Sequence, residues 1–581
     1  MARQLEQFDN LVSLFLTRAA DKGDRPFLWA KREGQWRPIS WAETARQVAA
    51  LAASLKQIGL EPGDRVALVS ENRPEWLIAD LAIMAAGCVT VPTYTTNTTR
   101  DHAHILGNSG ARAVIVSSQK LAKNLVPAVL TSDDCHHIIG IEDIRVGQVP
   151  DWVAVHHWSD LISGASDVGA LKDKVARFQR GDLACIIYTS GTGGAPRGVR
   201  LHHGSILQNL EGCTDIISSD FGWDEDIFLS FLPASHAYEH TGGQMFPIAL
   251  GAEIYYAESL EKLAANIEEV QPTIMVVVPR LFELLRARII KSIEASGGFS
   301  KYLLHRALKI GADKYDGRLK PWDMPMDGVL ALTLRRKIRA KMGSRVKAWV
   351  SGGAPLNPEV GIFFQSLGIT FLQGYGQTEA GPLISCNRPR VGIRLETVGP
   401  PSMNTEVRIA DDGEILVRGE NVMKGYWRNE EETARVLRDG WLATGDVGHF
   451  DEKGRIVITD RKKDLIVNDK GDNVSPQRIE GILTLQPEIA QAMVYGDRRP
   501  HLVALLVPDP EVARSADLHA RLQKAVDRVN ADLSVIEKVR RFILADEGFT
   551  IENEQLTPSM KIRRHVISKV YGERLDALYK R

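Results

Sequence analysis

The sequence predicts an α/β fold: a large N-terminal domain of mostly parallel sheets flanked by helices, a small β-rich subdomain and a small α+β C-terminal domain. Residues 26–180 alternate short apolar runs with helical stretches, which is typical of parallel sheets covered by helices. From about Glu406, short alternating strands and turns replace this pattern. A chain of 581 residues exceeds what one hydrophobic core supports, so we expect several domains.

The elements of the first region follow one another at short spacing. The apolar runs Arg65–Ser70, Val89–Val91 and Ala113–Val116 predict buried strands. Between the first two, Trp76–Ala86 has the apolar spacing of a helix and ends at Gly87. Strands that alternate with helices indicate parallel pairing.

The apolar run Leu183–Tyr188 predicts a buried strand that leads into a loop rich in glycine, serine and threonine. The backbone N–H groups and hydroxyls of such a loop can converge on an anion. Arg197 adds a fixed positive charge suited to phosphate oxygens. These features indicate a polyphosphate cradle, with a polar strand-to-helix turn as the alternative. Pro196 stands where the Walker loop and the Rossmann turn both need glycine, which excludes both.

Three later strands also lead into polar loops rich in glycine or proline. In an open parallel sheet, the strand ends on one side form the ligand crevice, so we expect these loops to meet there. The predicted strands are Asp226–Leu232, Lys347–Ser351 and Thr370–Gln373, and their loops are Pro233–Gly243, Gly352–Pro355 and Gly374–Glu379.

A further strand and a long helical region lie between the first two of these strands. Pro272–Val278 predicts the strand because it is a short, uninterrupted apolar run. Helical spacing then continues to Lys341, with interruptions at Gly297–Gly298 and Pro321–Pro325.

The dense charge run Asp460–Asp464 lies between two predicted strands and marks a domain boundary near Asp460–Lys463. We expect an N-terminal domain over residues 1–459, a hinge over 460–464 and a C-terminal domain over 465–581. The elements expected in the C-terminal domain are a helix start at Ser475-Pro476, a strand pair at 490–495 and 501–507, a helix near 511–530 and a last helix after Ser559.

The composition is that of an ordinary soluble globular protein, with 44% apolar and 25% charged residues. A net charge of −1 argues against nucleic-acid binding, which needs a basic excess. The five cysteines form no C-x-x-C pair, so neither a disulfide framework nor a zinc site is predicted, and a reducing compartment fits. The N-terminal residues do not predict a signal peptide, and no run of about 18 apolar residues predicts a spanning helix.

Several polar residues at strand ends or in loops have the chemistry of a nucleotide site. Thr378 and Glu379 place a hydroxyl beside a carboxylate, which suits phosphate contact together with Mg²⁺. Asp446 ends another predicted strand, and a carboxylate there can accept hydrogen bonds from ribose hydroxyls. Plain alternatives stay open: a solvated glutamate, a turn aspartate, a surface lysine at Lys561 and a structural histidine at His236.

Together these motifs resemble, in content and order, those of the AMP-forming acyl-CoA synthetases, a branch of the adenylate-forming enzymes. The resemblance spans about Asp24 to Lys569. It departs from the family pattern at Gly193, where the family usually has threonine, and at Arg197, where it usually has lysine. The charge of the loop is kept, but a planar guanidinium replaces a point charge.

The resemblance implies a role for each matched residue. Lys561 would bridge the carboxylate and the α-phosphate, where negative charge gathers during attack. Thr378 and Glu379 would act beside it, with His236 positioning the acyl group. Mg²⁺ would be held by Glu379 and Thr189, and Lys463 would be the hinge of a mobile C-terminal lid domain. The implied nucleotide-binding residues are Thr189, Ser190, Gly191, Thr192, Gly193, Gly194, Arg197, Gly353, Ala354, Pro355, Gln373, Gly374, Tyr375, Gly376, Asp446, Ile458 and Arg461.

The family's reaction has two halves. A carboxylate attacks the α-phosphate of Mg-ATP and gives acyl-AMP and pyrophosphate. The C-terminal domain then reorients, withdraws Lys561 and admits the thiol of CoA, which displaces AMP and gives a thioester. The resemblance therefore implies ATP and CoA as co-substrates and Mg²⁺ as cofactor.

Two segments resemble the long-chain fatty acyl-CoA synthetases in particular: Leu232–Glu239, and Gln271–Glu283 with the helical insertion after it. We therefore expect a medium- to long-chain fatty acid in an apolar tunnel. Tyr255, Tyr256 and residues near Phe246 are candidates for its wall and equally good core residues. A synthetase for a shorter, branched or aromatic acid stays open.

Three other functions stay open. A fatty acyl-AMP ligase would load a carrier protein and form acyl-AMP but no acyl-CoA. A luciferase-like oxidase would consume oxygen. A non-catalytic nucleotide-binding regulator would release no pyrophosphate, and the presence of Glu379 and Lys561 argues against it. We expect a cytoplasmic protein that binds no nucleic acid, and leave open peripheral contact with the inner face of a membrane and a homodimer.

Overall fold

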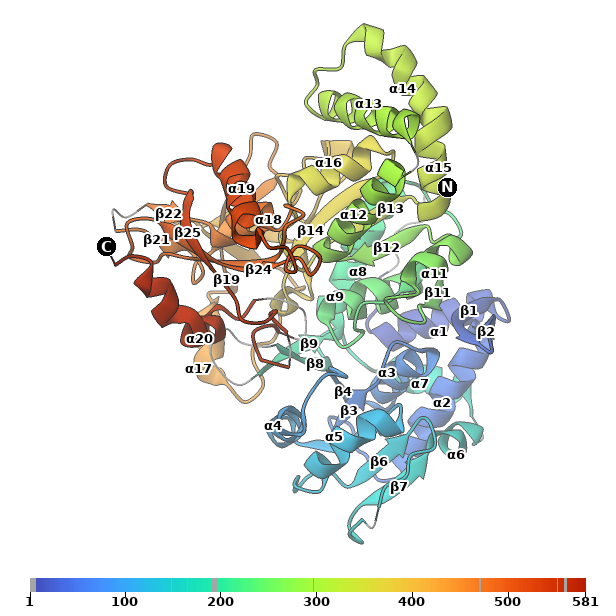
Figure 1. Cartoon of the computed structure of the whole chain (residues 1–581). Coiled ribbons are helices and arrows are strands. Elements are labelled where there is room, and N and C mark those ends of the chain that lie inside the picture. Colours follow the sequence, from blue (N-terminus) through green and yellow to red (C-terminus); the bar gives the residue numbers. More distant parts are fainter. Residues whose placement is uncertain are drawn as a thin grey trace.

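The computed structural model describes residues 7–147, 149–164, 166–189, 196–295, 297–469, 472–550, 552–557 and 562–580 (Figure 1). Two large sheets and their helices form most of the molecule, and the last residues form a separate layer beside them. The predicted α/β fold, with its large parallel-sheet part and smaller C-terminal part, is confirmed. Among the described residues, no helix combines the length and apolar character needed to cross a bilayer.

A seven-stranded sheet contains the predicted strands of the first region. Its neighbours pair in parallel except for the last two strands, which form an antiparallel pair. In spatial order the strands are β7 (Ala154–His157), β6 (His137–Gly140), β5 (Ala111–Val116), β3 (Arg65–Val69), β4 (Val89–Thr93), β8 (Leu183–Thr189) and β9 (Arg197–His202). The helices of this region are α2 (Trp41–Gln57), α3 (Pro74–Ala86), α4 (Thr99–Ser109), α5 (Gln119–Val129), α6 (Trp158–Ser163) and α7 (Val168–Val175).

The pairing of β8 with β9 corrects one interpretation of the glycine-rich loop. Thr189 lies opposite Arg197 in this antiparallel pair, so the loop joins two strands. The alternative of a strand-to-helix turn is therefore wrong. Residues 190–195 lie outside the described residues.

An eight-stranded sheet holds the other predicted strand ends. It is parallel from β14 to β1, with antiparallel strands at both edges. In spatial order the strands are β15 (Leu383–Cys386), β14 (Phe371–Gly376), β13 (Ala348–Ser351), β12 (Ile274–Val277), β10 (Ile227–Ser230), β11 (Glu253–Tyr256), β1 (Pro26–Arg32) and β2 (Gln35–Ser40). The helices of this region are α1 (Leu11–Lys22), α8 (His203–Asp220), α9 (Ala237–Glu239), η1 (His240–Met245), α10 (Phe246–Leu250), α11 (Leu263–Val270), α16 (Pro358–Ser366), η4 (Thr378–Ala380) and η5 (Pro389–Val391).

The long helical region begins with a helix packed on the eight-stranded sheet and continues as an insertion that projects from the body of the molecule (top of Figure 1). Its breaks fall at the glycine pair and the proline segment predicted to interrupt it. The helices are α12 (Pro279–Ala295), α13 (Gly298–Tyr315), η2 (Pro321–Asp323), α14 (Met324–Leu330), η3 (Ala331–Arg335) and α15 (Arg336–Met342).

The β-rich subdomain is a five-stranded antiparallel sheet, followed by a compact α+β part. Ser475 caps α18 as predicted, because its hydroxyl accepts a hydrogen bond from the Arg478 N–H at 3.4 Å. The elements are β16 (Glu406–Ile409), β17 (Glu414–Arg418), α17 (Glu430–Val436), β18 (Leu437–Arg438), β19 (Trp441–Phe450), β20 (Ile456–Arg461), β21 (Ile466–Val467), β22 (Asn473–Val474), α18 (Pro476–Leu483), β23 (Ile489–Tyr495), β24 (Leu502–Pro508), α19 (Leu518–Ala531), β25 (Val539–Leu544) and α20 (Arg564–Ala577).

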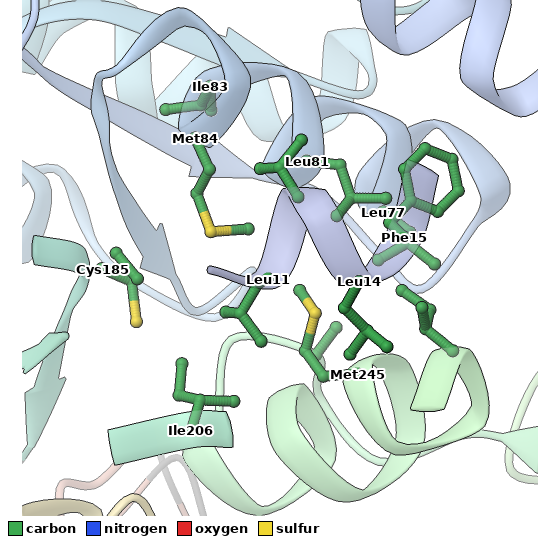
Figure 2. Packing of buried hydrophobic residues seen from close by; sticks show 14 of the residues in the cluster. Leu11, Leu14, Phe15, Leu77, Leu81, Ile83, Met84, Cys185, Ile206 and Met245 are labelled. Carbon is green, nitrogen blue, oxygen red and sulfur yellow. The ribbon is translucent and has the colours of Figure 1, made fainter. Parts of the chain in front are cut away.

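The largest hydrophobic core joins the two large sheets. Figure 2 shows apolar side chains of α1 and α3 gathered with Met245 of η1 in one buried cluster. Leu11, Leu14 and Phe15 recur at helical spacing and are buried, so this face of α1 packs into the core. This core fixes η1 beside the sheet ends that carry the predicted site.

We expect Leu14→Ala to lower the free energy of unfolding by about 2–5 kcal/mol, because it removes a buried side chain and leaves a cavity. Leu14 is 3% exposed, whereas Leu260 is 67% exposed. Leu260→Ala is therefore the matched control, with an expected change within about 0.5 kcal/mol. The urea midpoint measured by circular dichroism checks this, and equal midpoints for the two variants would contradict it.

Candidate active site

A cavity of about 1910 Å³ lies between the N-terminal sheets and the C-terminal part. Every sequence-predicted site residue that the structure describes lines it. From the N-terminal part and the predicted hinge these are Thr189, Arg197, His236, Gly353, Ala354, Pro355, Gln373, Gly374, Tyr375, Gly376, Thr378, Glu379, Asp446, Ile458, Arg461 and Lys463. Motifs far apart in the sequence thus face a common space.

Parallel pairing explains why the loops meet. β10, β12, β13 and β14 are consecutive neighbours and run in one direction, so their carboxyl ends lie at the same edge. Ser351 at the end of β13 pairs with Gln373 of β14. The loops after these two strands therefore begin side by side.

Glycines let backbone approach closely in this crevice. A Cβ on Gly376 would lie 2.0 Å from the Pro382 carbonyl oxygen, and one on Gly352 would lie 2.9 Å from the ring of Tyr238. Side chains at these positions would displace the neighbouring segments. The missing side chains therefore let these loops pack closely on Pro382 and Tyr238.

The side-chain oxygen Oε1 of Gln373 is buried and has no hydrogen-bond partner within the described residues. Gln373 also lines the cavity. An unpaired buried acceptor is costly, so this atom suits an amino group supplied by a ligand.

Asp446 is held from two sides. The Tyr375 hydroxyl donates a hydrogen bond of 2.6 Å to Oδ2, and the Arg461 Nε lies 3.4 Å from Oδ1. Burial and the neighbouring Asp446 carboxylate raise the pKa of Tyr375 well above its ordinary value, so it stays a donor. The register opposes Asp446 on β19 to Arg461 on β20, which brings carboxylate and guanidinium together.

Glu379 and Arg197 belong to one contact network at the other end of the crevice. The Tyr426 hydroxyl donates a hydrogen bond of 2.8 Å to Glu379 Oε1, which leaves Oε2 without a partner among the described residues. The Arg197 guanidinium lies 5.2 Å from the centre of the Tyr426 ring and forms an ion pair with Glu432. Arg197 is thus oriented by an aromatic face and a carboxylate before any phosphate binds.

His236 stands at the start of α9, where its Nδ1 accepts a hydrogen bond of 3.1 Å from the Tyr238 N–H. This bond fixes the ring at the cavity wall. Apolar side chains continue the wall beyond it: Ile216, Ile217, Phe246, Ile274, Val276 and Leu372.

The two tyrosines proposed for the tunnel wall do not line this cavity. Tyr255 stacks on Trp29 with ring centres 4.9 Å apart, and the hydroxyl of Tyr256 bonds to Gln244 at 2.9 Å inside the core. Both follow the alternation of β11, whose side chains pack against neighbouring strands and helices. The alternative that they are packing residues fits the structure, whereas Phe246 does line the cavity.

Comparison with known proteins identifies the family. Residues 15–427 match the AMP-binding enzyme family, and residues 463–581 match the AMP-binding enzyme C-terminal domain. The chain belongs to the AMP-binding enzyme family. This result confirms the resemblance stated from the sequence motifs.

Individual relatives align over nearly the whole chain. The long-chain-fatty-acid–CoA ligase FadD15 of Mycobacterium tuberculosis is 32% identical, covering 99% of this chain and 97% of that protein. The long-chain-fatty-acid–[acyl-carrier-protein] ligase AEE15 of Arabidopsis thaliana is 28% identical, covering 100% and 88%. The A domain of carboxylic acid reductase from Segniliparus rugosus, solved with AMP and a co-purified carboxylic acid, has a TM-score of 0.76 at 22% identity and covers 99% and 94%. This last likeness concerns the fold.

Two residues of this AMP-binding enzyme's crevice escaped the sequence interpretation. Tyr426 and Glu432 contact Glu379 and Arg197, yet Glu432 lies 235 positions from its partner. No spacing rule links such distant residues. The local signal in the sequence is the run Gly425-Tyr426-Trp427, where a glycine precedes two aromatic residues. In the structure this glycine has a φ of +100°, which residues with side chains rarely adopt.

Some predicted residues lie outside the described part of the chain. These are Ser190, Gly191, Thr192, Gly193, Gly194 and Lys561. The described residues on both sides of the lysine segment, Thr557 and Ile562, line the cavity. Thr189 and Arg197, the strand residues that flank the glycine-rich loop, line it as well.

A buried polar network supports the segment that carries Thr241 and Gly242 to the cavity. The Ser230 hydroxyl donates to Glu239 at 2.6 Å, and the Gln244 amide donates to Ser230 at 2.9 Å. Burial raises the pKa of Glu239 from 4.5 to about 8, against the lowering effect of the bonds from Ser230 and Gln244. The acid is therefore protonated in the folded protein near neutral pH.

We expect Glu239→Gln to remove a pH dependence of stability. Between pH 4.5 and about 8 the folded protein keeps a proton on Glu239 that the unfolded chain releases, so the free energy of unfolding falls as pH rises. The amide variant cannot ionise and should gain stability relative to the wild type across this window. Denaturation midpoints measured at several pH values check this, and parallel pH profiles would contradict the expectation.

Proposed function

We propose that this protein activates a long-chain fatty acid with ATP, giving acyl-AMP and pyrophosphate, and then transfers the acyl group to CoA, releasing AMP. The main support is that motifs from the two large sheets, the β-rich sheet and the C-terminal part all line one cavity. The relative from Mycobacterium tuberculosis, aligned over 99% of this chain, is named as a long-chain-fatty-acid–CoA ligase.

The nucleotide fits the polar half of the crevice. We assign the adenine to the glycine backbone at Gly353 and Gly374–Gly376, with its amino group at Gln373 Oε1. Asp446 would accept hydrogen bonds from the two ribose hydroxyls, because Tyr375 and Arg461 hold its carboxylate in place. The loop between Thr189 and Arg197 would then contact the phosphates.

Mg²⁺ fits between the phosphates and the network of Glu379. The carboxylate has one oxygen bonded to Tyr426 and the other without a partner among the residues that the structure describes, which suits a hard cation shared with phosphate oxygens. We assign the metal to Glu379 with the Thr189 hydroxyl. When bound, Mg²⁺ would offset the negative charge of the pyrophosphate leaving group.

The acyl chain fits the apolar half of the crevice. Ile216, Phe246 and Val276 supply a hydrocarbon surface, and His236 stands where this surface meets the polar half. We assign His236 to positioning the carboxylate, because its ring nitrogen Nδ1 already accepts the Tyr238 N–H. Burial of a long chain along this wall would favour long acids over short ones.

The second half-reaction needs a rearranged cavity, and the chain offers a joint for it. β20 ends at Arg461 and β21 begins at Ile466, with an exposed turn at Lys462 and Lys463 between them. We propose that residues 465–581 form a lid that turns about Lys463 and carries Lys561 toward and away from the α-phosphate.

Pyrophosphate release across a series of acids of rising chain length, with and without CoA, tests the function. We expect release that depends on a long acid, and acyl-CoA with free AMP when CoA is present. If acyl-AMP forms without acyl-CoA and a carrier protein is loaded, we would conclude that the acyl acceptor is the carrier protein and not CoA. Binding of ATP without pyrophosphate release for any acid would contradict the proposal.

We expect Lys561→Ala to reduce acid-dependent pyrophosphate release by at least about 100-fold, because it removes a cation that stabilises charge at the α-phosphate. ATP binding measured by calorimetry should change little. Lys569→Ala is the matched control, since Lys569 is an exposed lysine on the following helix. Full pyrophosphate release in the Lys561 variant would refute the assignment.

We expect Asp446→Asn to weaken ATP binding by roughly tenfold or more, because hydrogen bonds to an ionised acceptor contribute about 1.5–3 kcal/mol. Asp439→Asn is the control: Asp439 is exposed, lies in the turn before β19 and has a φ of +51° that asparagine tolerates. Calorimetric titration checks both variants, and equal affinities would argue against a ribose contact.

A further inference from the structure

The helical insertion exposes large apolar side chains in one place. Phe299 on α13 and Leu332 on η3 are each 74% exposed, and Val329 on α14 is 50% exposed. Soluble proteins seldom expose several large apolar side chains together unless the surface binds something.

These side chains line a groove of about 560 Å³ between α13 and the helices that follow it. Val329, Leu332, Arg336 and Ala340 recur at helical spacing, so they form one stripe along the continuous run of α14, η3 and α15. Arg336 and Lys337 line the same groove at its basic end. No residue of this groove lines the large cavity, within the described parts of the chain.

The insertion is strongly basic although the whole chain is nearly neutral. Residues 298–345 contain 12 lysines and arginines against four aspartates, whereas the net charge of the chain is −1. Three of these aspartates form ion pairs within the insertion. The pairs are Asp316 with Arg318, Asp323 with Arg306 and Asp327 with Arg335. Arg336 and Lys337 form no ion pair with the residues that the structure describes, so their charge faces solvent.

The position of the groove leaves it free to contact a large flat partner. α13, α14 and α15 project beyond the sheets at the top of Figure 1, away from the C-terminal part. The adjoining turn exposes Trp322 and Met324, which are 72% and 62% accessible to solvent. An aromatic residue beside basic residues is the composition that membrane interfaces favour.

We propose that this basic apolar groove, defined by Phe299, Leu303, Val329, Leu332, Arg336 and Lys337, docks the protein on an anionic membrane surface. The apolar side chains would enter the boundary between headgroups and acyl chains, while the arginine and lysine would pair with anionic headgroups. A second copy of this chain is a poorer fit, because its groove carries the same positive charge. A nucleic acid offers no hydrocarbon for Phe299, Val329 and Leu332.

Co-sedimentation of the full chain with lipid vesicles tests the surface. We expect binding to vesicles of phosphatidylcholine with phosphatidylglycerol and much weaker binding to phosphatidylcholine alone. High ionic strength should weaken binding, because it screens the attraction to the headgroups. The assay contains no nucleotide, acid or CoA, so its result is independent of the proposed function.

Two sets of variants separate the apolar and the charged contributions. Arg336→Glu with Lys337→Glu should weaken binding to anionic vesicles by at least about tenfold, and Phe299→Ser with Leu332→Ser should do the same. Arg521→Glu with Lys524→Glu on the exposed face of α19 makes an equal change in net charge, and Val535→Ser removes a side chain that is 72% exposed. Both controls should bind like the wild type.

Three results would overturn the proposal. The first is no binding of the wild type to anionic vesicles. The second is unchanged binding of both groove variants. The third is a dimer in light scattering that the Phe299 and Leu332 variant abolishes, without vesicle binding, which would assign the groove to a second copy of the chain.

Discussion

The site depends on one constraint, the parallel pairing of β10, β12, β13 and β14. Because these strands run in one direction, their carboxyl ends and the loops after them must lie at one edge of the sheet. The glycines in these loops then allow backbone segments to approach where a side chain would clash, as at Gly376 against Pro382. The sheet supplies the position, and the loops supply the chemistry.

A second layer of contacts joins this edge to elements that are distant in sequence. The Tyr375 hydroxyl connects β14 to Asp446 on β19, so a polar contact joins the eight-stranded and five-stranded sheets. Tyr426 similarly connects Glu379 to the stacked guanidinium of Arg197. Each contact fixes a charged group in a defined direction, which lowers the reorganisation needed when a charged ligand binds.

The departure of Arg197 from the usual lysine has a structural counterpart. A planar guanidinium can stack on Tyr426 and pair with Glu432 at the same time, which an ammonium does less well.

In the C-terminal part, Glu480 likewise holds the guanidinium of Arg564 in a fixed position through an ion pair. Arg564 begins α20, and its bond of 2.7 Å to Glu480 ties the start of that helix to α18. The pair is mostly withdrawn from solvent, so loss of either partner would leave an uncompensated charge.

The sequence by itself determined the fold class, most strands and the polar loops at their ends. Apolar runs such as Pro272–Val278 and the helical spacing of Trp76–Ala86 are local signals, set by which side chains must leave water. The motifs also sufficed to indicate the family. Only the tertiary structure decided that the glycine-rich loop joins two antiparallel strands, that Tyr255 and Tyr256 pack away from the cavity, and that Tyr426 and Glu432 belong to the crevice. These outcomes depend on contacts between residues far apart in the chain, and no local pattern of burial or propensity encodes such contacts.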